Sequence, residues 1–189
     1  MPPDLKPAVF LDRDGVIVEN RVGYVRSVAE VRFIPGALEA LARLAQSGRL
    51  IVIVTNQSAI GRGLLTRETA DAINACVVAA IESAGGRVDG LYLCPHRPDE
   101  NCRCRKPAPG LLLDAARDLS IDLAASVLIG DALSDVQAAQ AAGAQSILVL
   151  SGRGSAEELN GAGLNHIRTA PDLAAAVERL ARPTKTPPT

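Results

Sequence analysis

Short apolar runs recur along the chain, and each is followed by polar or glycine-rich residues. They cover residues 8–11, 50–54, 90–93, 127–129 and 146–150. Such runs are typical of strands buried on both faces of a parallel sheet. The residues between them predict helices at 35–47, 66–84, 109–119 and 134–142, and a last helix at 171–180. This alternation predicts an α/β fold with a doubly wound, mainly parallel sheet and right-handed crossovers.

The length of the chain fits one domain. Its 189 residues are enough to bury a substantial core. We expect a single domain over residues 1–182 and a disordered tail at 183–189, which is rich in proline and threonine. The irregular stretch at 16–33 is expected to form a flap over the first strand end, and no insertion is large enough for a separate cap domain.

Composition narrows the classes of partner. Twenty basic and 21 acidic residues give a net charge of -1, which offers no broad field for nucleic acid or an anionic membrane. No apolar segment approaches the ~18 residues that a membrane span needs, and the first residues lack the layout of a secretory signal. We therefore expect a cytoplasmic monomer that binds a small molecule, with its four cysteines reduced.

The first predicted strand runs directly into Asp12-Arg13-Asp14-Gly15. Two carboxylates about 4 Å apart repel by about 4 kcal/mol at an effective dielectric of ~20, so the sequence predicts a cation close by. The alternative is an acidic turn in which glycine supplies a positive φ.

Polar residues follow two more strands. Thr55, Asn56, Gln57 and Ser58 come after residues 50–54, and Gly130-Asp131 comes after 127–129, while Arg105-Lys106 precedes a predicted helix. The carboxyl ends of parallel strands meet at one edge of a sheet. Acids, a hydroxyl group and a fixed cation gathered there are what phosphoryl transfer through a nucleophilic carboxylate and a magnesium ion requires.

These motifs, in this order, resemble those of the haloacid dehalogenase superfamily. The resemblance implies that Asp12 is the nucleophile, that Asp14 protonates the leaving oxygen and then activates water, and that Thr55 and Lys106 hold the phosphate. It also implies Mg²⁺ on Asp12, Asp131 and the backbone carbonyl of Asp14, with Asp135 supporting the site through water. An acid at position 14 favours a phosphatase or a phosphomutase, and the missing cap domain favours the phosphatase.

Simpler interpretations of the same residues stay open. Asp131 and Asp135 also suit the capping of a helix N-terminus. Lys106 also suits a solvated surface position, and Thr55 an ordinary strand end.

Three cysteines and a histidine cluster within eleven residues, as Cys94, His96, Cys102 and Cys104. Three thiolates and an imidazole are a standard tetrahedral zinc set, and four protein ligands leave no open position, so the predicted Zn²⁺ is structural. Free or redox-active thiols are the alternative. Cys76 is expected to pack in the core, and His166 to be a surface or packing residue.

The cysteine cluster before Arg105-Lys106, together with Gly23-Tyr24-Val25 and residues 55–58, resembles the D-glycero-D-manno-heptose-1,7-bisphosphate 7-phosphatase family. The resemblance implies removal of the 7-phosphate through an aspartyl-phosphate. The expected substrate-binding residues, including Arg62 as a cation for a remote phosphate, are Asn20, Gly23, Tyr24, Thr55, Asn56, Gln57, Ser58, Arg62, Arg105 and Lys106.

Other functions remain as alternatives. Histidinol-phosphate phosphatases share the zinc loop but carry an aspartate where this chain has Ser58. The family usually has a lysine where this chain has Ala132, which predicts a weaker hold on the substrate. A nucleic-acid-binding zinc module and a catalytically inactive scaffold are the remaining classes, and the first lacks a basic patch and a stacking platform.

Overall fold

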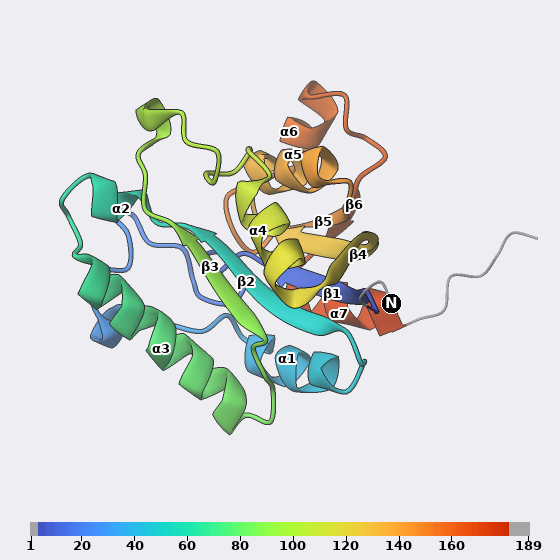
Figure 1. The fold of residues 1–189 in the computed structure, drawn as a ribbon, viewed down its shortest axis with the longest axis horizontal. Coiled ribbons are helices and arrows are strands. Elements are labelled where there is room, and N and C mark those ends of the chain that lie inside the picture. The colour runs from blue at the N-terminus through green and yellow to red at the C-terminus, as the bar shows by residue number, and fades with distance from the viewer. Residues whose placement is uncertain (1–3, 182–189) are drawn as a thin grey trace, which may run out of the picture.

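A computed structural model describes residues 4–181, so the predicted tail at 183–189 lies outside the described residues. Its centre is a six-stranded sheet in the order β3-β2-β1-β4-β5-β6, and every neighbouring pair is parallel (Figure 1). The strands are β1 Lys6–Leu11, β2 Leu50–Asn56, β3 Gly90–Cys94, β4 Ile121–Gly130, β5 Gln145–Val149 and β6 Arg168–Ala170. The prediction of a mainly parallel α/β sheet without a large cap domain is confirmed.

Helices cover both faces of the sheet (Figure 1). Val9 and Leu11 of β1 belong to a buried cluster that includes residues of α1, α3 and α7. Ala8 and Phe10 point to the other face, where they join α4 and α5. The alternation follows from the two-residue period of a strand. The helices are α1 Ala37–Ala45, α2 Ser58–Gly61, α3 Arg67–Ser83, α4 Gly110–Leu119, α5 Leu133–Ala142, α6 Ala156–Gly161 and α7 Leu173–Ala181, with short 3-10 helices η1 Val28–Glu30 and η2 Pro98–Glu100.

Some elements differ from the prediction. β4 is 10 residues long rather than three, because its first half contains the exposed Ala124 and Ala125 and so lacks an apolar run. The register of β4 against β1 also shifts between Pro7 and Val9. β6 and α6 were not predicted. Only Ala170 of β6 and Leu159 of α6 are buried, which is too little for a periodic pattern.

The strand order places the polar motifs together. β1 lies between β2 and β4, and Leu11 pairs with both Ile53 and Ile129. The residues that follow these positions therefore emerge side by side at the carboxyl edge of the sheet, as the general rule for open α/β sheets predicts. Over the described residues, the structure contains no helix with the length and apolarity needed to cross a membrane.

Candidate active site

Asp12 and Lys106 form an ion pair at the end of β1. The Lys106 Nζ lies 2.9 Å from Asp12 Oδ2 and 2.6 Å from Asp135 Oδ1, and it donates to the Val54 carbonyl at 2.9 Å. Burial raises the pKa of Asp12 to about 6, although Lys106 opposes the shift. Burial alone would lower the pKa of Lys106, but Asp12 and Asp135 outweigh it and hold the pKa above its usual value. The lysine is therefore a fixed cation beside the carboxylate.

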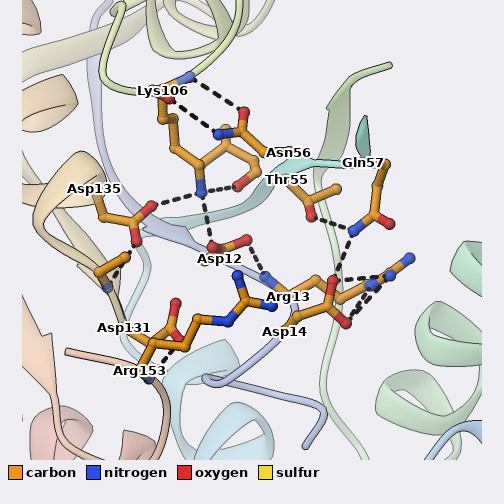
Figure 2. Close-up of polar contacts among 12 residues, drawn as sticks. Asp12, Arg13, Asp14, Thr55, Asn56, Gln57, Lys106, Asp131, Asp135 and Arg153 are labelled. Carbon is orange, nitrogen blue, oxygen red and sulfur yellow. Dashed lines mark hydrogen bonds and ion pairs between the residues drawn. The ribbon is translucent and has the colours of Figure 1, made fainter. Parts of the chain in front are cut away.

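Asp14 faces a different set of partners. Figure 2 shows its carboxylate turned towards Arg13 and Gln57, whereas Asp12 is turned towards Lys106. Arg13 Nη2 lies 2.9 Å from Asp14 Oδ2, and Gln57 Nε2 donates to the same oxygen at 2.7 Å. The sequence predicted a cation near the acidic pair. The structure has two, Lys106 beside Asp12 and Arg13 beside Asp14.

Asp12, Asp131 and Asp135 form an acidic cluster in which one oxygen from each lies within 4.8 Å of the others. Burial, and then repulsion from Asp12, raises the pKa of Asp131. Glycine is required around this carboxylate, because a Cβ at Gly15 or Gly152 would overlap it. Mg²⁺ prefers hard carboxylate oxygens, and Lys106 offsets only part of the negative charge of these three carboxylates, so these residues could hold the ion.

The carboxyl end of β2 and the residue that follows it hold Lys106 and Asp14 in place. The Asn56 side chain accepts from the Lys106 backbone N–H and donates to the Lys106 carbonyl, both at 3.1 Å. Gln57 donates to Thr55 Oγ1 at 2.9 Å as well as to Asp14. These residues therefore fix the backbone of the lysine and the carboxylate of Asp14.

A cleft of about 190 Å³ opens over these groups. Four arginines from four separate parts of the chain line it along with Lys106, namely Arg21, Arg62, Arg105 and Arg153. A neighbouring hollow shares Asn20, Arg21, Tyr24 and Arg153 with it. We call this space the active-site cleft. Its lining of acids and cations suits a substrate that carries more than one anionic group.

The cysteine loop, residues 94–104, lies beside the cleft. Its ligand atoms, Cys94 Sγ, His96 Nδ1, Cys102 Sγ and Cys104 Sγ, are 3.2–3.6 Å apart in the five pairs in contact. Tetrahedral zinc with bonds of about 2.3 Å to sulfur and about 2.0 Å to nitrogen sets its ligands about 3.5–3.8 Å apart. All four cysteines of the chain are free of disulfides, so the cluster fits Zn²⁺.

Backbone hydrogen bonds join this loop to the residues after β2. Gln57 N–H donates to the Cys94 carbonyl at 2.7 Å, and Gly61 N–H donates to the Pro95 carbonyl at 2.9 Å. The Arg105 guanidinium donates to the His96 carbonyl at 3.3 Å. Folding of the cysteine loop therefore helps to fix Arg105 and Lys106, which follow it directly.

Comparison with known proteins gives a consistent result. The HAD-hydrolase-like family matches residues 103–176. The D-glycero-beta-D-manno-heptose-1,7-bisphosphate 7-phosphatase of Bordetella bronchiseptica is 42% identical over 91% of this chain and 96% of its own length. The Vibrio cholerae protein of the same name is 44% identical over 81% of this chain and 86% of its own length. The chain belongs to this heptose-bisphosphate phosphatase family.

Solved structures agree with this family assignment. The crystal structure of the B. bronchiseptica D,D-heptose 1,7-bisphosphate phosphatase, complexed with magnesium and phosphate, has a TM-score of 0.86 and covers 92% of this chain and 97% of that one. The Burkholderia thailandensis phosphatase has a TM-score of 0.69 at 34% identity, covering 94% of this chain and 100% of that one. The resemblance inferred from the sequence motifs is confirmed.

The structure places the expected substrate-binding residues of this heptose-bisphosphate phosphatase family member in three groups. Most of the expected substrate-binding residues line the cleft: Asn20, Tyr24, Asn56, Ser58, Arg62, Arg105 and Lys106. Thr55 and Gln57 are buried behind it, and Gly23 lines the neighbouring hollow. Asn20 donates to Asp131 Oδ2 at 2.6 Å, so it also orients a carboxylate of the acidic cluster.

The two residues expected to lie outside the site have different outcomes. His166 is exposed, in agreement with the surface interpretation. Cys76 is only partly buried and lies outside the described core clusters. The prediction of core packing for Cys76 is therefore wrong, because on α3 it falls between the fully buried stripe and the exposed face.

Sequence reasoning missed three arginines of the site. Arg13 lies inside the Asp12–Gly15 motif, which by itself indicates no role for it, and Arg21 lies in the irregular stretch at 16–33. Arg153 follows β5, where its backbone N–H donates to Asp131 Oδ2 at 3.0 Å, and its side chain extends towards Asp12 (Figure 2). Polar residues after a buried strand had identified the other loops, and the same signal at residues 151–154 could have identified Arg153.

Proposed function

We propose that this protein is a Mg²⁺-dependent phosphatase that removes the 7-phosphate of D-glycero-D-manno-heptose 1,7-bisphosphate through an aspartyl-phosphate on Asp12. The observation that carries the proposal is the pairing of Asp12 with the buried Lys106 beside a second acid, Asp14, that has separate partners. This division suits one carboxylate for nucleophilic attack and another for proton transfer. The phosphatases compared above support the choice of substrate.

The reaction proceeds in two displacements. An Asp12 carboxylate oxygen attacks phosphorus, the bond from phosphorus to the sugar oxygen breaks, and protonated Asp14 donates its proton to that oxygen. Asp14 then takes a proton from water as the water oxygen attacks the aspartyl-phosphate, which releases inorganic phosphate and restores Asp12. Lys106 stabilises the negative charge on the transferring phosphoryl group.

Two metal ions have separate roles in this proposal. Mg²⁺, held by Asp12, Asp131 and the Asp14 backbone carbonyl with Asp135 in support, would offset the repulsion between the acids and the phosphate. Zn²⁺ on Cys94, His96, Cys102 and Cys104 would be structural. Because free cysteines in a ligand arrangement suit a reducing compartment, we place the enzyme in the cytoplasm. We also propose that it is a monomer.

The cations of the cleft favour a bisphosphate over histidinol phosphate. The remote phosphate of a bisphosphate finds arginines such as Arg62 and Arg105 on the cleft lining, and charge-assisted contacts with them stabilise it. Histidinol phosphate instead carries a positive charge, which these arginines repel. We expect no activity on either substrate without Mg²⁺.

The test compares kcat/KM for heptose 1,7-bisphosphate and histidinol phosphate. We expect the bisphosphate to be preferred, and Arg105→Ala to lower that preference. Arg103→Ala is the matched control, because Arg103 is 76% exposed and pairs with Asp114. A wild-type preference for histidinol phosphate would overturn the proposed substrate.

A further inference from the structure

Arg13 lies between Asp12 and Asp14 in the sequence but does not line the cleft. Its side chain is only 1% exposed, and it is among the largest fully buried side chains of the described residues. A buried guanidinium loses several kcal/mol of hydration unless charged and polar partners replace the water. Its partners therefore indicate what the residue does.

Arg13 contacts Asp14 through two of its nitrogens. Nη2 lies 2.9 Å from Asp14 Oδ2 and 3.2 Å from Oδ1, and Nε lies 3.4 Å from Oδ1. Among residues 4–181, no other carboxylate forms an ion pair with Arg13. The planar guanidinium thus meets the carboxylate along one edge, an arrangement that fixes its direction as well as its distance.

The other end of the guanidinium is anchored to α3. Nη1 donates to Asn74 Oδ1 at 2.7 Å, and Asn74 is buried in the middle of the helix. A rigid helix therefore supports Arg13, and Arg13 supports Asp14. Gln57 holds Asp14 Oδ2 from a different element.

We propose that Arg13 is a positioning residue that, anchored by Asn74, holds Asp14 at the angle needed to protonate the leaving group. The inference rests on the proposed function, in which Asp14 is the general acid. General acids must lie within hydrogen-bonding reach of the leaving oxygen, and they contribute about 10²–10⁴-fold. A lysine cannot replace Arg13, because one ammonium group cannot reproduce the fork that joins Asp14 to Asn74.

Leaving groups of different basicity distinguish this role from a structural one. An alkoxide leaves only when it is protonated, so the heptose substrate needs Asp14 in place. The p-nitrophenolate of p-nitrophenyl phosphate leaves without a proton. A misplaced general acid therefore slows the first displacement with the heptose substrate and leaves it nearly unchanged with p-nitrophenyl phosphate.

The experiment measures the rate of phospho-enzyme formation by rapid quench with both substrates and Mg²⁺. Arg13→Lys is expected to lower the rate with heptose 1,7-bisphosphate by about 100-fold and the p-nitrophenol burst by less than about threefold. Asn74→Ala removes the anchor without substituting Arg13 or Asp14, and it should give a smaller loss of the same kind. Arg67→Lys is the control, because Arg67 pairs with Asp71 on the exposed side of α3.

A double variant tests whether Arg13 acts through Asp14. In the Asp14→Asn background, Arg13→Lys should cause no further loss with the heptose substrate, because residues that act as a unit are not additive. Equal losses with both substrates, or additive losses in the double variant, would overturn the inference. If Arg13→Lys fails to fold, Asn74→Ala takes its place in the test. Equal losses of rate with both substrates in Asn74→Ala would then overturn the inference.

The proposed function is tested separately by the wild-type protein. Failure of the wild type to form a phospho-enzyme from heptose 1,7-bisphosphate would overturn the proposed function, and the inference with it. Normal wild-type turnover with equal losses in the Arg13 variants would overturn only the inference.

Discussion

The active-site cleft and the cysteine loop are neighbours, but they are assembled in opposite ways. The four side chains of the loop that are proposed to hold zinc come from eleven consecutive residues, and their nearest sulfur and nitrogen atoms are 3.2–3.6 Å apart. The acids and cations of the cleft come from the segments that follow β1, α2, β4 and β5 and from the segment before α4, and they meet only when the sheet has formed. The loop can therefore gain stability from one ion, whereas the cleft depends on the whole fold.

The acids of the cleft also carry an electrostatic cost. Burial raises the pKa values of Asp12 and Asp131, so the ionised cleft is less favourable than the same acids in water. Such perturbed groups are typical of functional sites. We infer that the unfavourable charge of the cleft serves catalysis, and that the cysteine loop stabilises the folded protein. The following predictions test that division.

The largest expected effect is the loss of catalysis in Asp12→Asn. Without the nucleophilic carboxylate, kcat should fall by about 10⁴-fold or more, while the fold remains intact. The measurements are steady-state turnover, phospho-enzyme trapping with beryllium fluoride and circular dichroism. Near-normal turnover by this variant would rule out Asp12 as the nucleophile.

Cys102→Ser is expected to lower stability and activity together. Loss of one of the four ligands weakens metal binding, and metal binding to such a site contributes directly to folding. The melting temperature should fall by on the order of 10 °C, a loss of several kcal/mol for a domain of this size. The matched control is Cys76→Ser, which alters a cysteine far from the cluster in sequence.

Elemental analysis provides the complementary measurement. Protein purified without added metal should contain zinc, and Cys102→Ser should contain less. Absence of zinc from the wild type, or unchanged stability in the variant, would contradict the metal-dependent role of the loop.

Ionisation of Asp12 is expected to change the free energy of unfolding by about 3 kcal/mol between low and neutral pH. Its pKa rises from 3.8 to about 6 on folding, so the folded protein binds more protons than the unfolded chain between these values. Stability should therefore fall as pH rises through this window, by about 1.4 kcal/mol for each unit of the shift. Asp12→Asn should remove this part of the slope, and near pH 7 it should be the more stable protein.

Urea unfolding of wild type and Asp12→Asn from pH 4 to 7 measures this difference. The buffer contains no Mg²⁺ and no chelator, so that the zinc proposed for the cysteine loop is not removed. Parallel stability curves for the two proteins would show that Asp12 is not under electrostatic strain.

The smallest expected effect comes from Ala132→Lys. Ala132 lines the cleft beside Asp131, and a lysine there would add a cation for the substrate. An exposed charge contact of this kind stabilises by up to about 1 kcal/mol, so kcat/KM for the bisphosphate should rise about two- to fivefold. An unchanged kcat/KM would show that this position makes no contact with the substrate.

Sequence and structure contribute differently to this site. The Asp12-Arg13-Asp14-Gly15 motif shows an acidic pair after a strand, but not that Asp12 faces Lys106 while Asp14 faces Arg13. We expect Asn56 and Gln57 to contact substrate, and only the structure shows that Asn56 also bonds to the Lys106 backbone and Gln57 to Asp14. A sequence gives the type of each polar residue, whereas its hydrogen-bond partner depends on elements that are distant in the chain.

By itself, the sequence determined the parallel α/β architecture, the order of the motifs, the cysteine cluster and the family. These features depend on local periodicity and on residues a few positions apart. Such residues lie in one strand end or one loop, so their pattern can be read directly from the sequence. Only the tertiary structure decided the extent of β4, the edge strand β6, the burial of Arg13 against Asn74 and the entry of Arg153 into the cleft. Each of these depends on packing between segments far apart in the chain, where burial and charge compensation outweigh local preference.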